Sequence, residues 1–542
     1  MTHQAAARAT PAITLAQRMR MLARRETALT LALLGALATF YVSPSPLIAL
    51  PVLVVYAALA GLRLDLAVCL LPLAFPFWYV PKRVLGHTVF PLSEIALAVC
   101  LGVALVREGR RLVHRAGRRQ LLVHLRTQAA RLRWPLLLAI AAFLASGVLG
   151  VLVARRPREA LRDLRWEMIE PLLYLLLLLL YARGPRALPR LVWAFLGSAA
   201  LLAALGLLQS ALVHVTFSAL EAGNRLVPLL PGADGTYRAT AFVYGSGNSL
   251  AAYVERAVPL VVAMLLASRG SAPPSSRRTR LALASLTGLY VAALLATQSR
   301  GALLATAGVT LALVAVAVGR PRWTVAGAAV IALGLVAFAT AGGARVVASL
   351  VASHPDSVQI RLLLWLAAGH MLRDHPLLGI GLDQFRYYYS SLYTAHPYWV
   401  TVWNGQTTSV WREPDLAHPH NLLLDLWLNI SFVGLVAFGA ILGTFLRRCL
   451  LLWRVSAASA ARPGTGWLAS VALGVCGSVV VGVLHGMVDS AYFVPDLALI
   501  FWWSIGVLLV AERSGGNGPR TVLGWPSMIR WGRRQSDESS QA

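Results

Sequence analysis

The chain has 542 residues, of which 58% are apolar and only 13% are charged, and its mean hydropathy is +0.66. This composition excludes a soluble globular domain. The formal net charge of +27 does not argue for nucleic-acid binding, because arginines spread over short loops are the usual consequence of membrane topology and of contact with anionic lipids. We therefore expect a polytopic membrane protein whose partners include membrane lipids and no nucleic acid.

Apolar runs long enough to cross a hydrocarbon core of about 30 Å recur along the whole chain. They are continuous rather than alternating, which favours helices over a barrel. We predict an all-α fold with about 12–14 transmembrane helices, near residues 27–43, 46–62, 64–80, 88–106, 134–153, 166–182, 191–213, 249–268, 281–298, 302–318, 324–341, 421–446, 466–485 and 495–511. The neighbours 46–62 and 64–80 are separated by little more than Arg63 and could instead form a re-entrant hairpin.

The polar segments divide the chain. A basic tail, 1–26, precedes the helices of 27–341, and one long polar loop, 342–420, separates these from the helices of 421–511. Residues 512–542 form a second tail, which we expect to be disordered. Within the first group, 107–133 alternates arginines with leucines, which is typical of an amphipathic helix on the inner membrane surface.

Charge predicts the orientation of the bundle, because basic segments stay in the cytoplasm. With the N-terminus inside, most of the 49 basic residues fall in inner segments. Both termini are then cytoplasmic, and the long loop faces outward. The four cysteines are scattered through apolar runs and resemble core residues, not a disulfide framework or a metal site.

Several arginines lie on the outer face, where the charge rule does not explain them. Arg300 sits in a very short link between two apolar helices, Arg238 lies in an earlier loop, and Arg361 begins a helical stretch of the long loop. Guanidinium groups bind phosphate bidentately, so a lipid-linked diphosphate is a suitable partner. The alternatives are arginines that contact ordinary headgroups or solvent. A further cluster, Arg155 to Arg165, shares its segment with acidic residues that could pair with it.

The sequence His418-Pro419-His420-Asn421 stands at the end of the long loop, just before an apolar run. A neutral imidazole can take a proton from a hydroxyl near neutral pH, so a general base is the favoured interpretation. Asn421 can cap the following helix. A metal site using both histidines and Asp415 is weaker, because no third histidine and no Asp-x-Asp sequence supports it. A purely structural loop end is the remaining alternative.

Four elements in chain order resemble the O-antigen ligase and polymerase superfamily, over roughly 225–510. They are Arg238-Ala239-Thr240-Ala241-Phe242 with Asn248-Ser249-Leu250-Ala251, Ser299-Arg300-Gly301-Ala302, Arg361 and Trp365 with His375-Pro376-Leu377-Leu378-Gly379-Ile380-Gly381, and His420-Asn421 with Gly434. Two positions depart from the family patterns. Ala241 and Ser431 stand where those patterns have glycine.

The resemblance implies a C-class glycosyltransferase-like fold in a bacterial inner membrane, with a cavity facing the periplasm. Such enzymes move a glycan from an undecaprenyl-diphosphate carrier onto an acceptor hydroxyl, with inversion and without a metal or other cofactor. On this basis His420 is the expected base, and His418 orients it or lines the acceptor path. The remaining site residues are expected to be diphosphate ligands, namely Arg300, Arg238 and Arg361, and supporting residues, namely Asn421, Asn248, His485 and Asp489.

The spacing of His420-Asn421 to Gly434 fits the ligase pattern, which favours ligation to lipid A-core over polymerisation of a growing glycan. Both reactions use the same chemistry and differ in the acceptor. A transporter or flippase of lipid-linked glycans would also have many helices and outer arginines, but most spans lack the midplane charges and helix breaks typical of transport. A metal-dependent hydrolase is a third hypothesis.

Overall fold

The computed structural model of the chain describes residues 15–85, 88–113, 115–216, 238–270, 276–317, 357–389, 393, 399–403, 406–411, 417–459 and 465–514. Its first helices are α1 (Leu15–Val42), α2 (Pro46–Leu62), α3 (Leu64–Leu70), the 3-10 helix η1 (Leu71–Trp78), α4 (Leu92–Val113), α5 (Arg115–Leu132), α6 (Trp134–Val153), α7 (Pro157–Asp163), the π-helical turn η2 (Leu164–Ile169), α8 (Glu170–Tyr181) and α9 (Ala187–Thr216). The later helices are α10 (Gly247–Val254), α11 (Ala257–Gly270), α12 (Arg277–Thr297), α13 (Arg300–Ala317), α15 (Ser357–Asp374), α16 (Phe385–Tyr388), α17 (Leu422–Ala458), α18 (Thr465–His485) and α19 (Pro495–Ser514).

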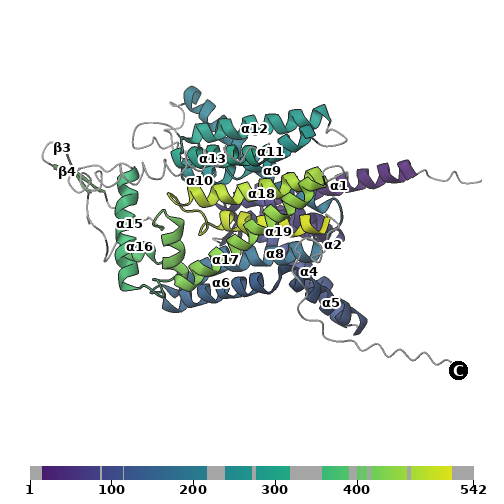
Figure 1. Ribbon diagram of the computed structural model, residues 1–542, viewed down its shortest axis with the longest axis horizontal. Helices are drawn as coiled ribbons and strands as arrows, with labels where there is room; N and C mark the ends of the chain where they lie inside the picture. The colour runs from purple at the N-terminus through teal and green to yellow at the C-terminus, as the bar shows by residue number, and fades with distance from the viewer. Residues whose placement is uncertain are drawn as a thin grey trace, which may run out of the picture.

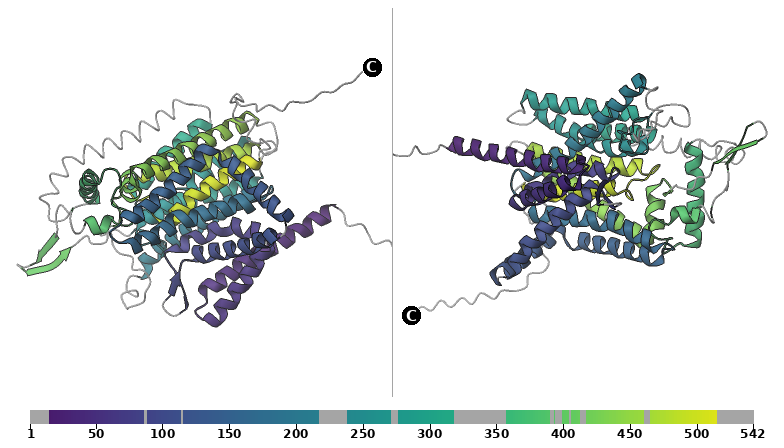
Figure 2. Two further views of the ribbon diagram at one scale, coloured as in Figure 1. Left: turned by 90° about the horizontal axis from the view of Figure 1, so that it is seen from below. Right: turned by 180° about the vertical axis from the view of Figure 1, so that it is seen from behind.

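Two small antiparallel hairpins complete the described secondary structure. One pairs β1 (Lys82–Leu85) with β2 (Thr88–Phe90), and the other pairs β3 (Trp399–Trp403) with β4 (Gln406–Trp411). The helices run side by side along the long axis of the molecule, and α15 crosses one end of the bundle (Figures 1 and 2). The chain is therefore an all-α polytopic membrane protein, as its composition predicts.

Fewer helices than expected are suited to a full membrane crossing. Eight helices in the described part of the chain are long and apolar enough, or nine if one bent pair counts as a span. The apolar part of α1 and the 12-residue α8 are shorter than a bilayer requires, and the predicted span 324–341 lies outside the described residues. The prediction of 12–14 spans counted apolar runs without regard to where a helix breaks.

The bent pair lies in the predicted neighbours 46–62 and 64–80. The two helical segments meet at an angle of 115° at Arg63, so they form a broken span or a re-entrant loop rather than two crossings. The second segment continues through η1, which contains Pro72 and Pro76 and cannot keep a regular α-helical hydrogen-bond ladder. The hairpin alternative therefore fits the geometry better than two separate spans.

The centre of the bundle is formed by α17, α18 and α19. Helix α19 packs against α8, α18 against α11, and α17 against α6. The side chains of Trp502 and Trp503 in α19 are fully buried, and every residue of this helix from Pro495 to Ala511 is buried. Such complete burial holds the short segment before α19 in a fixed position at the end of the bundle.

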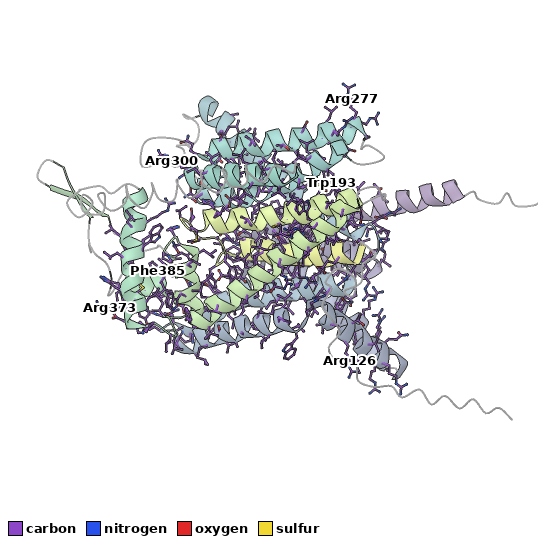
Figure 3. All side chains as sticks on the ribbon, in the orientation of Figure 1. Arg126, Trp193, Arg277, Arg300, Arg373 and Phe385 are labelled. Atoms are coloured by element: carbon purple, nitrogen blue, oxygen red, sulfur yellow. The ribbon has the colours of Figure 1, made fainter. Side chains whose placement is uncertain are left out.

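The two ends of the bundle differ in structure. Arg126 and Arg277 lie at one end, whereas Arg373 and Phe385 lie at the other (Figure 3). Helix α5, which contains most of the basic segment 107–133, projects from the first end, and Arg513 in the last turn of α19 bonds Gln128 there. The described chain thus starts and finishes at the α5 end of the bundle, opposite α15.

The predicted loop 342–420 contains secondary structure of its own. Helices α15 and α16 share a small apolar core with the first half of α17, which includes Leu364, Met371 and Leu428. These helices lie across the end of the bundle opposite α5, and the β3–β4 hairpin projects away from it (Figure 1). The early part of the predicted loop lies outside the described residues.

Candidate functional site

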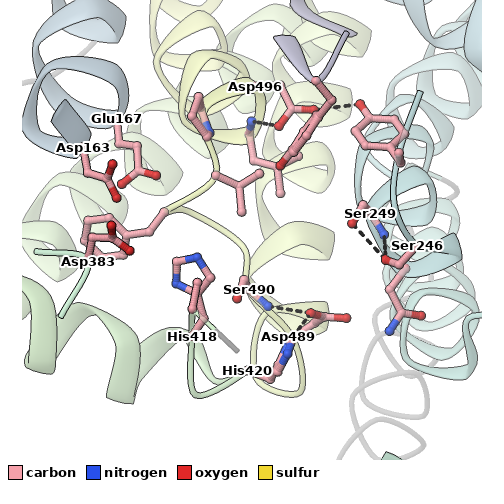
Figure 4. A pocket seen from close by; sticks show the side chains of 18 of the residues that line it. Asp163, Glu167, Ser246, Ser249, Asp383, His418, His420, Asp489, Ser490 and Asp496 are labelled. Carbon is pink, nitrogen blue, oxygen red and sulfur yellow. Dashed lines mark hydrogen bonds and ion pairs between the residues drawn. The ribbon is translucent and has the colours of Figure 1, made fainter. Parts of the chain in front are cut away.

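A cavity of about 660 Å³ opens at the end of the bundle beneath α15. Residues from η1, α7, η2, α10, α15 and the segments before α17 and α19 meet there, although they are far apart in the sequence. The lining includes Trp78, Tyr79, Arg162, Asp163, Trp166, Glu167, Tyr244, Ser246, Asn248, Ser249, Arg361, Asp383, Arg386, His418, His420, Asp489, Ser490 and Asp496. Figure 4 shows the polar residues on its walls.

His420 is held by the backbone of the segment that precedes α17. Its φ angle is 51°, in the left-handed region that is uncommon for a residue other than glycine. Trp365 in α15 donates from Nε1 to the His420 carbonyl at 3.3 Å. Asn421 caps α17, as predicted, by accepting from two backbone amides, and its own amide donates to the Met487 carbonyl at 2.9 Å. The imidazole is therefore presented from a fixed turn.

The hydrogen-bond partner of the His420 ring comes from another part of the chain. His420 Nδ1 lies 2.8 Å from Asp489 Oδ1, in the segment between α18 and α19 (Figure 4). An ionised carboxylate only accepts hydrogen bonds, so Nδ1 carries the proton and Nε2 keeps its lone pair. An imidazole in this tautomer can act as a base through Nε2, in the manner of a histidine–aspartate pair in acyl-transfer enzymes.

Asp489 is surrounded by positive groups. Burial by itself raises the pKa of its carboxyl, but the hydrogen bond and charge of His420, with the charges of His485 and Arg361, bring that pKa well below its usual range. Arg361 Nη2 lies 3.6 Å and His485 Nε2 lies 3.9 Å from Asp489 Oδ2. Asp489 thus stays ionised and keeps His420 in one tautomer.

The predicted pair of His485 and Asp489 is present, but the shorter contact of His485 is elsewhere. Its Nδ1 lies 3.0 Å from Oε2 of Glu255, which is fully buried. The backbone of Gly301 leaves room for this arrangement, since a Cβ there would approach the His485 ring to 3.0 Å. The Ser299-Arg300-Gly301 element thus packs the start of α13 against His485.

His418 is bound to a different carboxylate. Its Nδ1 lies 3.3 Å from Asp425 Oδ1 in the first turn of α17, and Asn429 donates to the same oxygen at 2.8 Å. Burial lowers the pKa of His418, but the charge and hydrogen bond of Asp425 outweigh this and raise the pKa overall. His418 lines the cavity without a hydrogen bond to His420 among the described residues. Among the described residues, Asp489 and not His418 bonds the His420 ring.

The three arginines expected at a diphosphate take different positions. Arg361 lines the cavity beside Asp489. Arg238 is half-buried behind the wall, where its Nε donates to the Thr297 carbonyl at 2.7 Å and its Nη2 bonds Asn248, which does line the cavity. Arg300 is exposed at the start of α13, outside the cavity lining. The structure thus brings only Arg361 of the three directly into the cavity.

Glycines in the segment between α15 and α16 allow it to pack on α17. Gly379 has a φ of 69°, and a Cβ there would lie 2.3 Å from the Leu428 carbonyl oxygen. The amides of Ile380 and Gly381 donate to that same oxygen at 2.8 and 3.1 Å. Leu428 lies just before a break in α17, so the close approach satisfies a carbonyl near the break.

That break lies at one of the two departures from the family patterns. Ser431 has φ 72° and ψ 167°, a region populated almost entirely by glycine. Ala241, the other departure, has φ 57°. Both chain positions therefore have the backbone conformation for which glycine is best suited, although this sequence uses a small L-residue at each.

An acidic wall, formed by Asp163, Glu167 and Asp383, was not predicted as part of the site. It faces Ser246 and Ser249 across the cavity (Figure 4). Burial and the charge of Asp383 raise the pKa of Asp163 to about 6. Asp163 and Glu167 belong to the arginine-rich segment whose charges were expected to pair among themselves, so the sequence offered only a hint of this wall.

Arg162 partly confirms that internal pairing, since it bonds Asp163 at 2.9 Å and Asp383 at 2.8 Å. Arg386 also bonds Asp383. For the metal hypothesis, Asp415 lies outside the described residues. Within the described ranges, no group of three or more His, Cys, Asp or Glu side chains is arranged to hold a metal ion.

Comparison with protein families gives one match. Residues 283–439, which run from α12 into α17, match a family model described as O-antigen ligase. The matched region contains Arg300, Arg361, His418 and His420, whereas Asp489 and the acidic wall except Asp383 lie outside it. No curated protein matches the chain. Over these residues the match confirms the resemblance drawn from the motifs.

Proposed function

We propose that the protein is a metal-independent inverting glycosyltransferase of the ligase type. It would move a glycan from an undecaprenyl-diphosphate carrier onto a hydroxyl of lipid A-core. The observation that carries this proposal is the His420–Asp489 hydrogen bond at the wall of a cavity that also contains Arg361. A base and a phosphate-binding cation in one cavity match the two needs of an inverting displacement.

In the reaction, His420 Nε2 takes the proton of the acceptor hydroxyl while the hydroxyl oxygen attacks the anomeric carbon. A new glycosidic bond forms as the bond between that carbon and the diphosphate oxygen breaks. The electron pair leaves with undecaprenyl diphosphate, and the proton stays on the imidazole, where Asp489 stabilises the resulting positive charge. Arg361 is placed to stabilise charge on the leaving diphosphate. Arg238 and Arg300 serve donor binding from outside the cavity lining.

The proposed location is the bacterial inner membrane, with both termini in the cytoplasm and the cavity facing the periplasm. Arg126 and Arg277 lie at the end opposite the cavity (Figure 3), and basic segments stay on the cytoplasmic side. Ligation is proposed ahead of polymerisation because His420-Asn421 and Gly434 have the spacing of the ligase pattern. A polymerase would use the same site with a growing glycan as its acceptor.

Reconstitution in proteoliposomes tests the proposal. The donor is undecaprenyl diphosphate bearing a short glycan, and the acceptor is a rough lipopolysaccharide that carries lipid A-core alone. We expect transfer with the wild-type chain, loss with His420→Ala, and wild-type transfer with the matched control His370→Ala, an exposed histidine on α15. Glycan elongation without transfer to the core would identify a polymerase. Carrier movement without a new glycosidic bond would identify a flippase, and activity that a chelator abolishes would support the hydrolase.

A further inference from the structure

Glu167 is a buried carboxylate that the proposed displacement does not use. Glu167 is only 4% exposed, yet it lines the cavity. Among the residues that the structure describes, its side chain has no hydrogen-bond or ion-pair partner. Burying an unpaired carboxyl is costly, so such a group takes up a proton or finds a hydrogen-bonding partner, which a ligand in the cavity can supply.

The local backbone supports a functional role for this position. Glu167 lies in η2, where the helix between α7 and α8 takes a single π-helical turn. Such turns are rare and occur mainly at functional sites, because the extra residue per turn displaces side chains from the regular helical face. Here the turn places Glu167 beside Asp163 and opposite Asp383 (Figure 4).

The acidic wall engages its neighbouring guanidinium groups with its own carboxyls. Its three carboxyl groups face two guanidinium groups, those of Arg162 and Arg386, and both of these are paired with Asp163 or Asp383. This leaves Glu167 without a cationic partner among the described residues. A diphosphate finds a cation at Arg361, which lies on α15.

The remaining lining indicates the chemistry of the occupant. Trp78 and Trp166 form an edge-to-face pair at 5.0 Å beside Glu167, and both rings line the cavity. Aromatic surface next to carboxyl groups suits a sugar, whose ring has apolar faces and whose hydroxyls bond carboxyl oxygens in either protonation state. The described residues include no metal-binding group of three such ligands, which favours hydroxyls over a cation.

We propose that Glu167, with Asp163 and Asp383, forms the subsite that binds the sugar hydroxyls of the acceptor. This rests on the proposed function, since it assigns the acceptor to the acidic wall and the donor diphosphate to the Arg361 side. Glu167 then selects an acceptor by its hydroxyl pattern, and His420 takes the proton from one hydroxyl of the bound sugar.

Two measurements test the subsite. The first is calorimetric binding of core oligosaccharide, freed of its lipid, to the purified full-length chain. We expect binding to weaken on the order of tenfold in Glu167→Gln and to be lost in Glu167→Leu, while Glu159→Gln, an acid of the adjacent α7 outside the cavity lining, binds as the wild type. The second is transfer, in which Glu167→Gln should raise the acceptor KM and leave the donor KM unchanged.

The outcomes separate the two proposals. The subsite is overturned if Glu167→Leu binds the oligosaccharide as tightly as the wild type does. It is also overturned if the wild type does not bind the oligosaccharide. Oligosaccharide binding that depends on Glu167, without any transfer, supports the subsite and rejects the glycosyltransferase. His420→Ala should bind the oligosaccharide and transfer nothing. The isosteric Glu167→Gln variant guards against misfolding, which size-exclusion chromatography and thermal unfolding would detect.

Discussion

His418 and His420 are two residues apart, and each is paired with a different carboxylate in different surroundings. His420 bonds Asp489, a residue 69 positions away in the segment before α19. His418 bonds Asp425, seven positions away in the first turn of α17. The first contact joins two ends of the bundle's central helices at the cavity, whereas the second closes a local turn.

The difference is the reason that we propose His420, and not His418, as the base. Asp489 also lies near Arg361 and His485, so the His420–Asp489 pair has further basic side chains beside it at the cavity. Asp425 is fixed by Asn429, whose side-chain Oδ1 in turn accepts from the backbone amide of Asp383 at 2.9 Å. The second pair is therefore part of the framework that joins α17 to the segment before α16.

The largest expected effect is the loss of the base. His420→Ala should lower kcat about a thousandfold, because a positioned general base contributes roughly two to four orders of magnitude. His418→Ala should cost far less. Transfer rates in proteoliposomes measure both, and equal losses in the two variants would remove the distinction between the pairs.

The next effect concerns the tautomer of His420. Asp489→Asn should lower kcat by about two orders of magnitude without unfolding the protein, because an amide can donate to Nδ1 and so stabilises the wrong tautomer. Unchanged kcat in this variant would contradict the role of Asp489. Nitrogen NMR of labelled histidine would show the change of tautomer directly.

A smaller effect is expected for donor binding. Arg361→Ala should raise the donor KM about tenfold, because a charge-assisted contact to phosphate is lost. Arg373→Ala is the matched control, since it is an exposed arginine on the same helix. Steady-state kinetics with varied donor measure both. A donor KM unaffected by Arg361→Ala would place the diphosphate elsewhere.

The contribution of the His418–Asp425 pair to the stability of the protein should depend on pH. His418 has a folded pKa raised above its unfolded value of about 6.5, so the pair stabilises fully below that pH and its contribution is lost as pH rises through the folded pKa. Asp425→Asn should therefore lower the Tm more at about pH 6 than at about pH 9. An equal loss at both values would show that protonation of His418 does not contribute.

The smallest expected effect lies in α17 below the framework pair. Ser431→Gly should stabilise the protein by about 1 kcal/mol, because glycine adopts φ 72° and ψ 167° without steric strain. Ser431→Ala, which keeps the strain, is the control. Thermal unfolding in detergent measures both, and a lower Tm for Ser431→Gly would mean that the serine hydroxyl, 3.4 Å from the Gly434 amide, matters more.

The sequence predicted the class of fold and the resemblance to the O-antigen ligase superfamily. Continuous apolar runs specify membrane helices because lipid leaves the backbone no other partners. The His420-Asn421 element was found from residue type and position alone, and Asn421 is the predicted cap. The helix count was less accurate, since hydropathy does not register the break at Arg63 or the π-helical turn before α8.

What the sequence by itself determined is which residues carry chemistry, because an imidazole, a guanidinium or a carboxyl keeps its character wherever it lies. Only the tertiary structure decided which of them meet. Asp489 was predicted as a supporting residue, and the packing of α17 and α19 places it against His420. Arg300 lies outside the cavity lining, whereas Glu167 is part of it. Contacts between distant segments depend on helix packing and on local breaks, which leave little trace in the order of residues along the chain.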